Sequence, residues 1–166
     1  MAQSSGKLRS NALAVFVKQG STEYDIVAGA TSSSLSMEFE QLDITTKDES
    51  GATAVLPGNI TWSIQCDGLM QYDTKNIAGL DSTEVKSSYA LSGLFLAKTK
   101  VTLAWSTGNA DDPIYTGDAF ITSFEESAGM NEIASFSCTF SGNGAITQAA
   151  NATGITFNVV DANSVS

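Results

Sequence analysis

The chain has 166 residues, of which 42% are hydrophobic, enough for the core of a single domain spanning residues 1–166. It contains no histidine, the side chain that most often acts as general base or metal ligand near neutral pH, so we expect no enzymatic activity, cofactor or metal ion. A net charge of −10 argues against a surface that binds nucleic acid by neutralising its phosphates.

The first residues form a basic segment ahead of the first predicted strand. This segment contains Lys7 and Arg9 and no acidic residue, and we expect residues 1–10 to be a flexible N-terminal arm. No apolar stretch is long enough for a signal sequence or a membrane span. We therefore expect a protein that is made and kept in the cytosol and has no membrane partner.

Alternation of apolar and polar residues predicts β-strands through most of the chain. In residues 34–40, we expect Leu35, Met37 and Phe39 on a buried face and Ser36, Glu38 and Glu40 on the other. Residues 61–67 and 134–141 repeat the pattern and place Trp62, Cys66 and Cys138 in the core, with both cysteines as reduced thiols. Segments rich in β-branched or aromatic residues predict further strands at residues 12–18, 24–28, 100–106, 119–125 and 153–160.

Two segments between predicted strands look like long excursions. Residues 42–59 are rich in threonine and end in Pro57-Gly58, and loops of more than about a dozen residues usually bind something or are mobile. We expect this loop to make inter-subunit contacts, with another copy of the protein as the candidate partner. The second excursion, residues 107–113, carries Asp111 and Asp112, which together with Asp118 could indicate a calcium site. A solvated turn is favoured, because the spacing matches no EF-hand loop.

One amphipathic helix interrupts the strands. Asp81 is its predicted N-cap, with Glu84 three residues later, and apolar residues from Val85 to Phe95 then recur at three- and four-residue spacing. The predicted fold is therefore mainly β: an antiparallel β-sandwich or barrel with one α-helix, followed by a C-terminal strand and tail over residues 148–166.

The order of several segments resembles the major tail tube proteins of long-tailed bacteriophages. The matching strings are LDITTKD at residues 42–48, VLPG at 55–58, TWSI at 61–64, DGL at 67–69, YTGDAFITS at 115–123 and FSCTFSGNGAIT at 136–147. The resemblance implies a protomer that assembles into hexameric rings, which stack into a tube through which DNA leaves the capsid. It also implies a tape measure protein inside the growing tube, terminator and tail tip or baseplate proteins at its ends, and a place in the virion tail.

Candidate site residues follow from the polar faces and the excursion. We expect the lumen to be lined by Ser36, Glu38, Glu40, Ser135, Ser137, Thr139 and Ser141. We expect ring stacking to use Lys7, Arg9, Asp43, Thr46, Lys47 and Asp48. A lumen of acids and hydroxyls would repel phosphates and let DNA slide without specific binding.

Two other classes of protein remain open from the sequence. A related tube protein of a secretion system, similar to Hcp, would share the ring-forming architecture. An immunoglobulin-like capsid decoration or adhesion module would not polymerise into a hollow cylinder. Oligomeric form separates this last class from the tube proteins.

Overall fold

The structure is a computed structural model, and it describes residues 13–19, 23–27, 29–46, 53–70, 85–109, 112–151 and 156–158. These residues contain ten strands and one helix. In chain order, the elements are β1 (Ala14–Gln19), β2 (Glu23–Val27), β3 (Ala30–Asp43), β4 (Val55–Leu69), β5 (Val85–Lys86), α1 (Ser88–Leu96), β6 (Val101–Ser106), β7 (Pro113–Ser127), β8 (Ser135–Gly142), β9 (Thr147–Ala150) and β10 (Thr156–Asn158).

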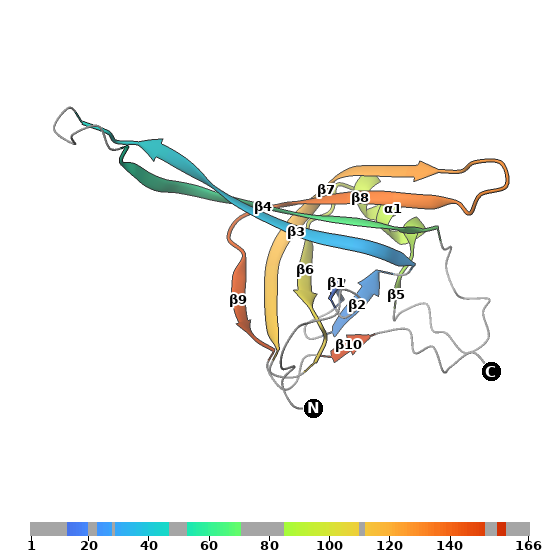
Figure 1. The fold of residues 1–166 in the computed structure, drawn as a ribbon. Helices are drawn as coiled ribbons and strands as arrows, with labels where there is room; N and C mark the ends of the chain where they lie inside the picture. Colours follow the sequence, from blue (N-terminus) through green and yellow to red (C-terminus); the bar gives the residue numbers. More distant parts are fainter. Residues whose placement is uncertain are drawn as a thin grey trace.

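The strands form one mostly antiparallel sheet in the order β10-β2-β1-β6-β7-β8-β4-β3 (Figure 1). β5 and β10 pair with β2 in parallel, and β9 pairs with the first half of β7. The predicted fold, mainly β with one helix, is confirmed. The short strands β5 and β9 carry no alternation long enough to predict them from sequence.

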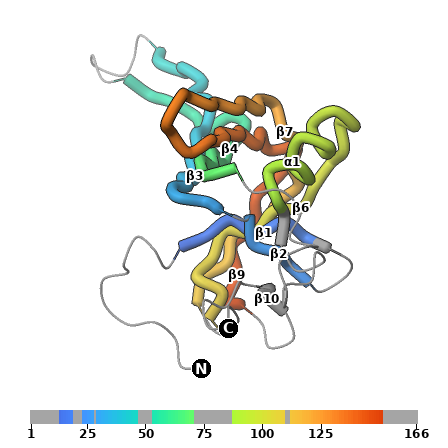
Figure 2. Tube along the Cα trace, turned by 90° about the vertical axis from the view of Figure 1, so that its right-hand side faces the viewer, coloured from blue at the N-terminus to red at the C-terminus, as the bar shows by residue number. Residues whose placement is uncertain are grey.

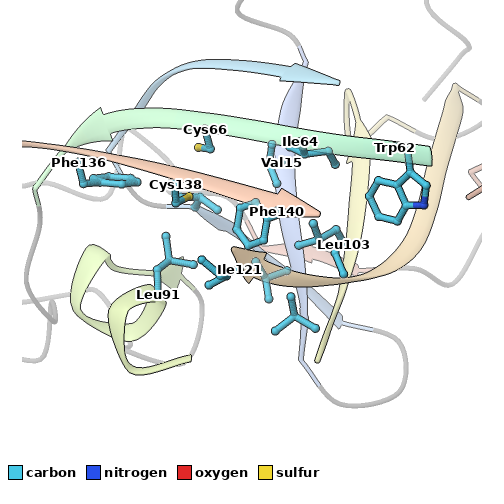
Figure 3. Packing of buried hydrophobic residues seen from close by; sticks show 14 residues of the cluster. Val15, Trp62, Ile64, Cys66, Leu91, Leu103, Ile121, Phe136, Cys138 and Phe140 are labelled. Atoms are coloured by element: carbon cyan, nitrogen blue, oxygen red, sulfur yellow. The ribbon is translucent and has the colours of Figure 1, made fainter. Parts of the chain in front are cut away.

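The long strand β7 joins two parts of the sheet that lie on opposite sides of the core. Its first half pairs with β6 and its second half with β8. Figure 3 shows that side chains of β4 and β8 pack together with those of β1, β6 and α1 in one core. The core contains Val15, Val17, Val27, Trp62, Ile64, Cys66, Leu91, Val101, Leu103, Ala119, Ile121, Phe136, Cys138 and Phe140.

Both cysteines are free thiols in this core, as the sequence predicts. Cys66 of β4 lies directly opposite Cys138 of β8. Hydrogen bonding with Cys66, together with burial, raises the pKa of the Cys138 thiol far above its usual range. The Cys138 thiol therefore remains protonated in the folded protein, and both buried cysteines behave as small apolar side chains.

The helix begins later than the sequence predicts. Ser87 is the N-cap of α1, and its Oγ accepts a hydrogen bond of 3.3 Å from the Ala90 backbone N–H. Val85, which we expected on the helix, lies in β5 opposite Ile26. The predicted cap at Asp81 lies outside the described residues.

The hairpin of β3 and β4 replaces most of the loop predicted at residues 42–59. β3 continues to Asp43 and β4 begins at Val55, so the two strands form a long arm that projects from the body (Figures 1 and 2). A β-bulge on β4 keeps the strands paired, because Phe39 lies opposite Ile60 while Gln41 lies opposite Pro57.

Asp112, which we expected in a solvated turn, is buried, whereas Asp111 lies outside the described residues. Asp112 is only 2% exposed, and its carboxylate accepts a hydrogen bond of 2.5 Å from Thr107 Oγ1.

Among the described residues, no helix is both long and apolar enough to cross a membrane.

Candidate assembly interface

The two polar faces predicted to line the lumen lie on the same side of the sheet. Ser36 of β3 is opposite Ser63 of β4, which in turn is opposite Ser141 of β8. Directly opposed residues project from the same face of a sheet. The polar members of this face are Ser32, Ser34, Ser36, Glu38, Glu40, Thr61, Ser63, Gln65, Asp67, Ser123, Glu125, Ser127, Ser135, Ser137, Thr139 and Ser141.

The polar face carries only negative formal charge. Its acids are Glu38, Glu40, Asp67 and Glu125, and strands β3, β4, β7 and β8 contain no lysine or arginine. Its apolar members, Leu69 and Phe120, lie opposite Ser135 and Ser141 near the two ends of β8. An anionic polymer near this face would meet hydroxyl groups and repulsive charge, but no cation to hold it.

Asp67 connects three strands on the polar face. Its carboxylate accepts a hydrogen bond of 2.6 Å from Ser137 Oγ of β8 and one of 3.0 Å from Ser32 Oγ of β3. The hydrogen bond from Ser137 is the largest cause that lowers the pKa of Asp67 below its usual value, with a smaller contribution from Ser32. This carboxylate is therefore charged at neutral pH, as part of a fixed network.

The β3–β4 arm, residues 37–46 and 53–61, exposes apolar side chains along its length. Met37 and Phe39, which we expected to be buried, are 48% and 52% exposed, and Ile60 opposite Phe39 is 64% exposed. Leu42, Ile44, Val55 and Leu56 are also exposed near the end of the arm. Exposed apolar patches of this kind mark surfaces that another molecule covers. The prediction that Met37 and Phe39 are buried was wrong for the single protomer, because the arm extends beyond the core.

Hydrogen bonds join Asp43, Thr45 and Ala54 near the end of the arm. The Asp43 carboxylate accepts hydrogen bonds from the Thr45 backbone N–H at 2.8 Å and from Thr45 Oγ1 at 2.6 Å. The hydrogen bond from the Thr45 hydroxyl is the largest cause that lowers the pKa of Asp43, and the one from the backbone N–H adds to it. The Asp43 carboxylate is therefore charged at neutral pH. The Ala54 backbone N–H donates to Thr45 Oγ1 across the two strands.

The structure locates only some of the residues predicted for ring stacking. Asp43 and Thr46 are exposed near the end of the arm. Lys7, Arg9, Lys47 and Asp48 lie outside the described residues. The exposed apolar residues of the arm were missed as contact residues, although the apolar runs flanking residues 45–54 are visible in the sequence.

Two strand edges that flank the polar face have no partner among the described residues. β3 pairs only with β4, which leaves its outer edge free. β6 pairs with β7 only as far as Ala119 and β9 only as far as Thr116, so the second half of β7 is paired on one side, by β8. Free edges present unpaired backbone groups and are templates for pairing with another chain.

The family model for phage tail tube proteins matches residues 9–148. The chain belongs to the phage tail tube protein family. The family predicted from the sequence strings is thus confirmed, and the tail tube protein described here is a structural protein of the phage tail. No curated protein matches its sequence.

Solved structures of other tail proteins share the fold. The tail of an empty gene transfer agent particle, solved with C6 symmetry, contains a chain that is similar with a TM-score of 0.71 and 19% identity, covering 87% of the tail tube protein and 100% of that chain. A chain of the native gene transfer agent virion is similar with a TM-score of 0.69 and 18% identity, with the same coverage of both chains. A chain of the SPP1 tail tube is similar with a TM-score of 0.63 and 12% identity, covering 87% of the tail tube protein and 80% of that chain.

Proposed function

We propose that six copies of this tail tube protein close into a ring, and that the rings stack into the hollow tube through which phage DNA passes to the host. The observation that carries this proposal is the pair of free strand edges on either side of one anionic polar face. Directions alternate along β7, β8, β4 and β3, so the β3 edge of one copy can pair antiparallel with the β7 edge of the next.

Six-fold closure gives a channel of useful width. The similar gene transfer agent tail was solved with C6 symmetry. With the same symmetry, four strands from each of six copies make a closed sheet of twenty-four strands. Barrels of about 16 to 18 strands already leave an aqueous channel. In this arrangement, Ser36, Glu38, Glu40, Ser135, Ser137, Thr139 and Ser141 line the lumen together with Asp67 and Glu125.

The arm and the basic N-terminal segment join one ring to the next. The exposed apolar residues of the arm become buried on a neighbour, and Asp43, Thr46, Lys47 and Asp48 supply polar contacts at its end. Lys7 and Arg9 are attracted to the acidic surface of adjacent copies. The further partners are a tape measure protein, a tail terminator and tail tip or baseplate proteins, with assembly in the host cytoplasm.

Negative-stain electron microscopy of the purified protein, across a series of protein and salt concentrations, tests this function. We expect six-fold rings or hollow tubes, formed by the protein alone or after addition of a tail tip complex. Persistent monomers in the presence of the tip complex would contradict the proposal and favour a decoration or adhesion module. A secretion-system tube would also form rings, so tubes joined to phage capsids are needed to distinguish the two.

A further inference from the structure

The end of the arm combines an apolar surface with a fixed negative charge. Leu42 lies directly opposite Leu56, so their exposed side chains project from the same face of the hairpin. Asp43 follows Leu42, and hydrogen bonds from Thr45 hold its carboxylate. A site that receives this segment should therefore have an apolar floor and a cation at its rim.

The groove between α1 and strands β1 and β6 has these properties. It has a volume of about 630 Å³, and its apolar lining includes Val17, Leu94 and Val101. Lys18 and Lys100 line it as well. Lys100 forms an ion pair of 2.9 Å with Asp118 and is the largest cause that lowers the pKa of this carboxyl. Lys18 is exposed, and its charge also contributes to lowering the pKa of Asp118, although no ion pair joins the two. The chain has eighteen acidic and only eight basic residues, so a groove lined by two lysines is an uncommon site for binding an acidic side chain.

A second hollow, of about 280 Å³, does not fit the end of the arm. Its lining includes Asp67, Glu125 and Ser137, and belongs to the anionic polar face. Docking Asp43 there would place like charges together, which disfavours the contact. The α1 groove is therefore the better receptor of the two.

Only another copy of the chain can bring an arm to this groove. The arm belongs to β3 and β4 at one edge of the sheet, and β8, β7 and β6 separate these strands from β1. The arm also points away from the body and from α1 (Figure 1). Each protomer thus carries a protruding segment and a receiving groove in different places, which is the arrangement that stacks copies head to tail.

We propose that the end of the arm of one copy docks in the α1 groove of a copy in the adjacent ring, with Leu42 and Leu56 on the apolar floor and Asp43 beside Lys18. This inference rests on the proposed tube assembly and specifies its ring-to-ring contact. Every groove and every arm is occupied in the interior of the tube, whereas one end of the tube has free arms and the other end has free grooves.

Cross-linking between introduced cysteines tests the docking directly. Leu42→Cys combined with Gly93→Cys places one thiol on the arm and one on the groove, where a side chain at residue 93 meets no atom within 4 Å. The native thiols are buried and do not compete. A short bismaleimide should link separate copies in tubes of this variant. Leu42→Cys with Met130→Cys, at a position 93% exposed, is the matched control and should give no such link.

The outcomes separate the docking from tube formation itself. Tubes seen by electron microscopy without the cross-link, or with equal cross-linking in the control pair, would overturn the docking and leave the tube intact. Failure of the parent protein to form rings or tubes, even with a tail tip complex, would overturn both.

A charge exchange provides an independent readout. Asp43→Lys or Lys18→Glu alone should raise the protein concentration required for tubes by about five- to tenfold, because either change opposes like charges at each of the ring-to-ring contacts. The double variant should recover most of this loss. Glu132→Lys, at an exposed position of the β7–β8 turn, changes the net charge by the same amount as Asp43→Lys and is its matched control. Loss in the double variant equal to the sum of the two single losses would overturn the pairing.

Discussion

Trp62 is buried against backbone that only glycine can supply. Its Nε1 donates a hydrogen bond of 2.9 Å to the Gly144 carbonyl oxygen. A Cβ atom built at Gly117 would lie 2.5 Å from the indole ring, and one at Gly142 would lie 2.3 Å from it. The period-two pattern was sufficient to predict that Trp62 is in the core. It could not reveal these two contacts, because they join positions far apart in the chain.

Gly142→Ala should destabilise the protomer because the new methyl group overlaps the indole ring. We expect the free energy of unfolding, measured by urea denaturation of the monomer, to fall by about 1 to 3 kcal/mol. Gly93→Ala is the matched control, since its Cβ enters open space on α1, and it should stabilise by up to about 1 kcal/mol. Equal stability of Gly142→Ala and the parent protein would show that the ring moves freely.

At the scale of the element, α1 depends on a single N-terminal cap. Ser87→Ala removes the acceptor for the Ala90 N–H at a position that is only 5% exposed. The free energy of unfolding should therefore decrease by about 0.5 to 2 kcal/mol. Ser92→Ala, inside the same helix, removes only a hydrogen bond to the Tyr89 carbonyl and should change stability little. Identical losses for the two variants would exclude a capping role.

The helix and the arm show how far local patterns determine this fold. The sequence predicted a cap at Asp81 with Glu84 three residues later, whereas the helix is capped by Ser87. Val85 pairs with Ile26 of β2 and is therefore in a strand, and this long-range contact has no sequence signature. Similarly, Met37 and Phe39 have the alternation of buried residues, but the core ends before it reaches them.

At the scale of the whole molecule, the polar face is where sequence and structure agree most closely. Two strands distant in sequence were each predicted to have a polar side, and β4 joins those sides into one face through Ser63, Gln65 and Asp67. Whether this face lines a lumen depends on contacts between copies. The sequence of one protomer constrains these contacts only through its free edges and exposed apolar residues.

Reversing the charge of the proposed lumen should impede DNA passage without preventing assembly. Glu38 and Glu40 are exposed on the polar face, and Glu38→Lys with Glu40→Lys replaces repulsion of phosphates by attraction in every copy of every ring. Genome ejection from particles carrying this variant should be slower or incomplete, and high salt should restore it because added ions screen the attraction. Glu23→Lys with Glu132→Lys changes the net charge equally at exposed positions off this face, and ejection should proceed as in the parent particle. If both double variants ejected DNA at the parent rate from intact tails, these glutamates would not face the DNA, and a different surface of the protomer would have to line the channel.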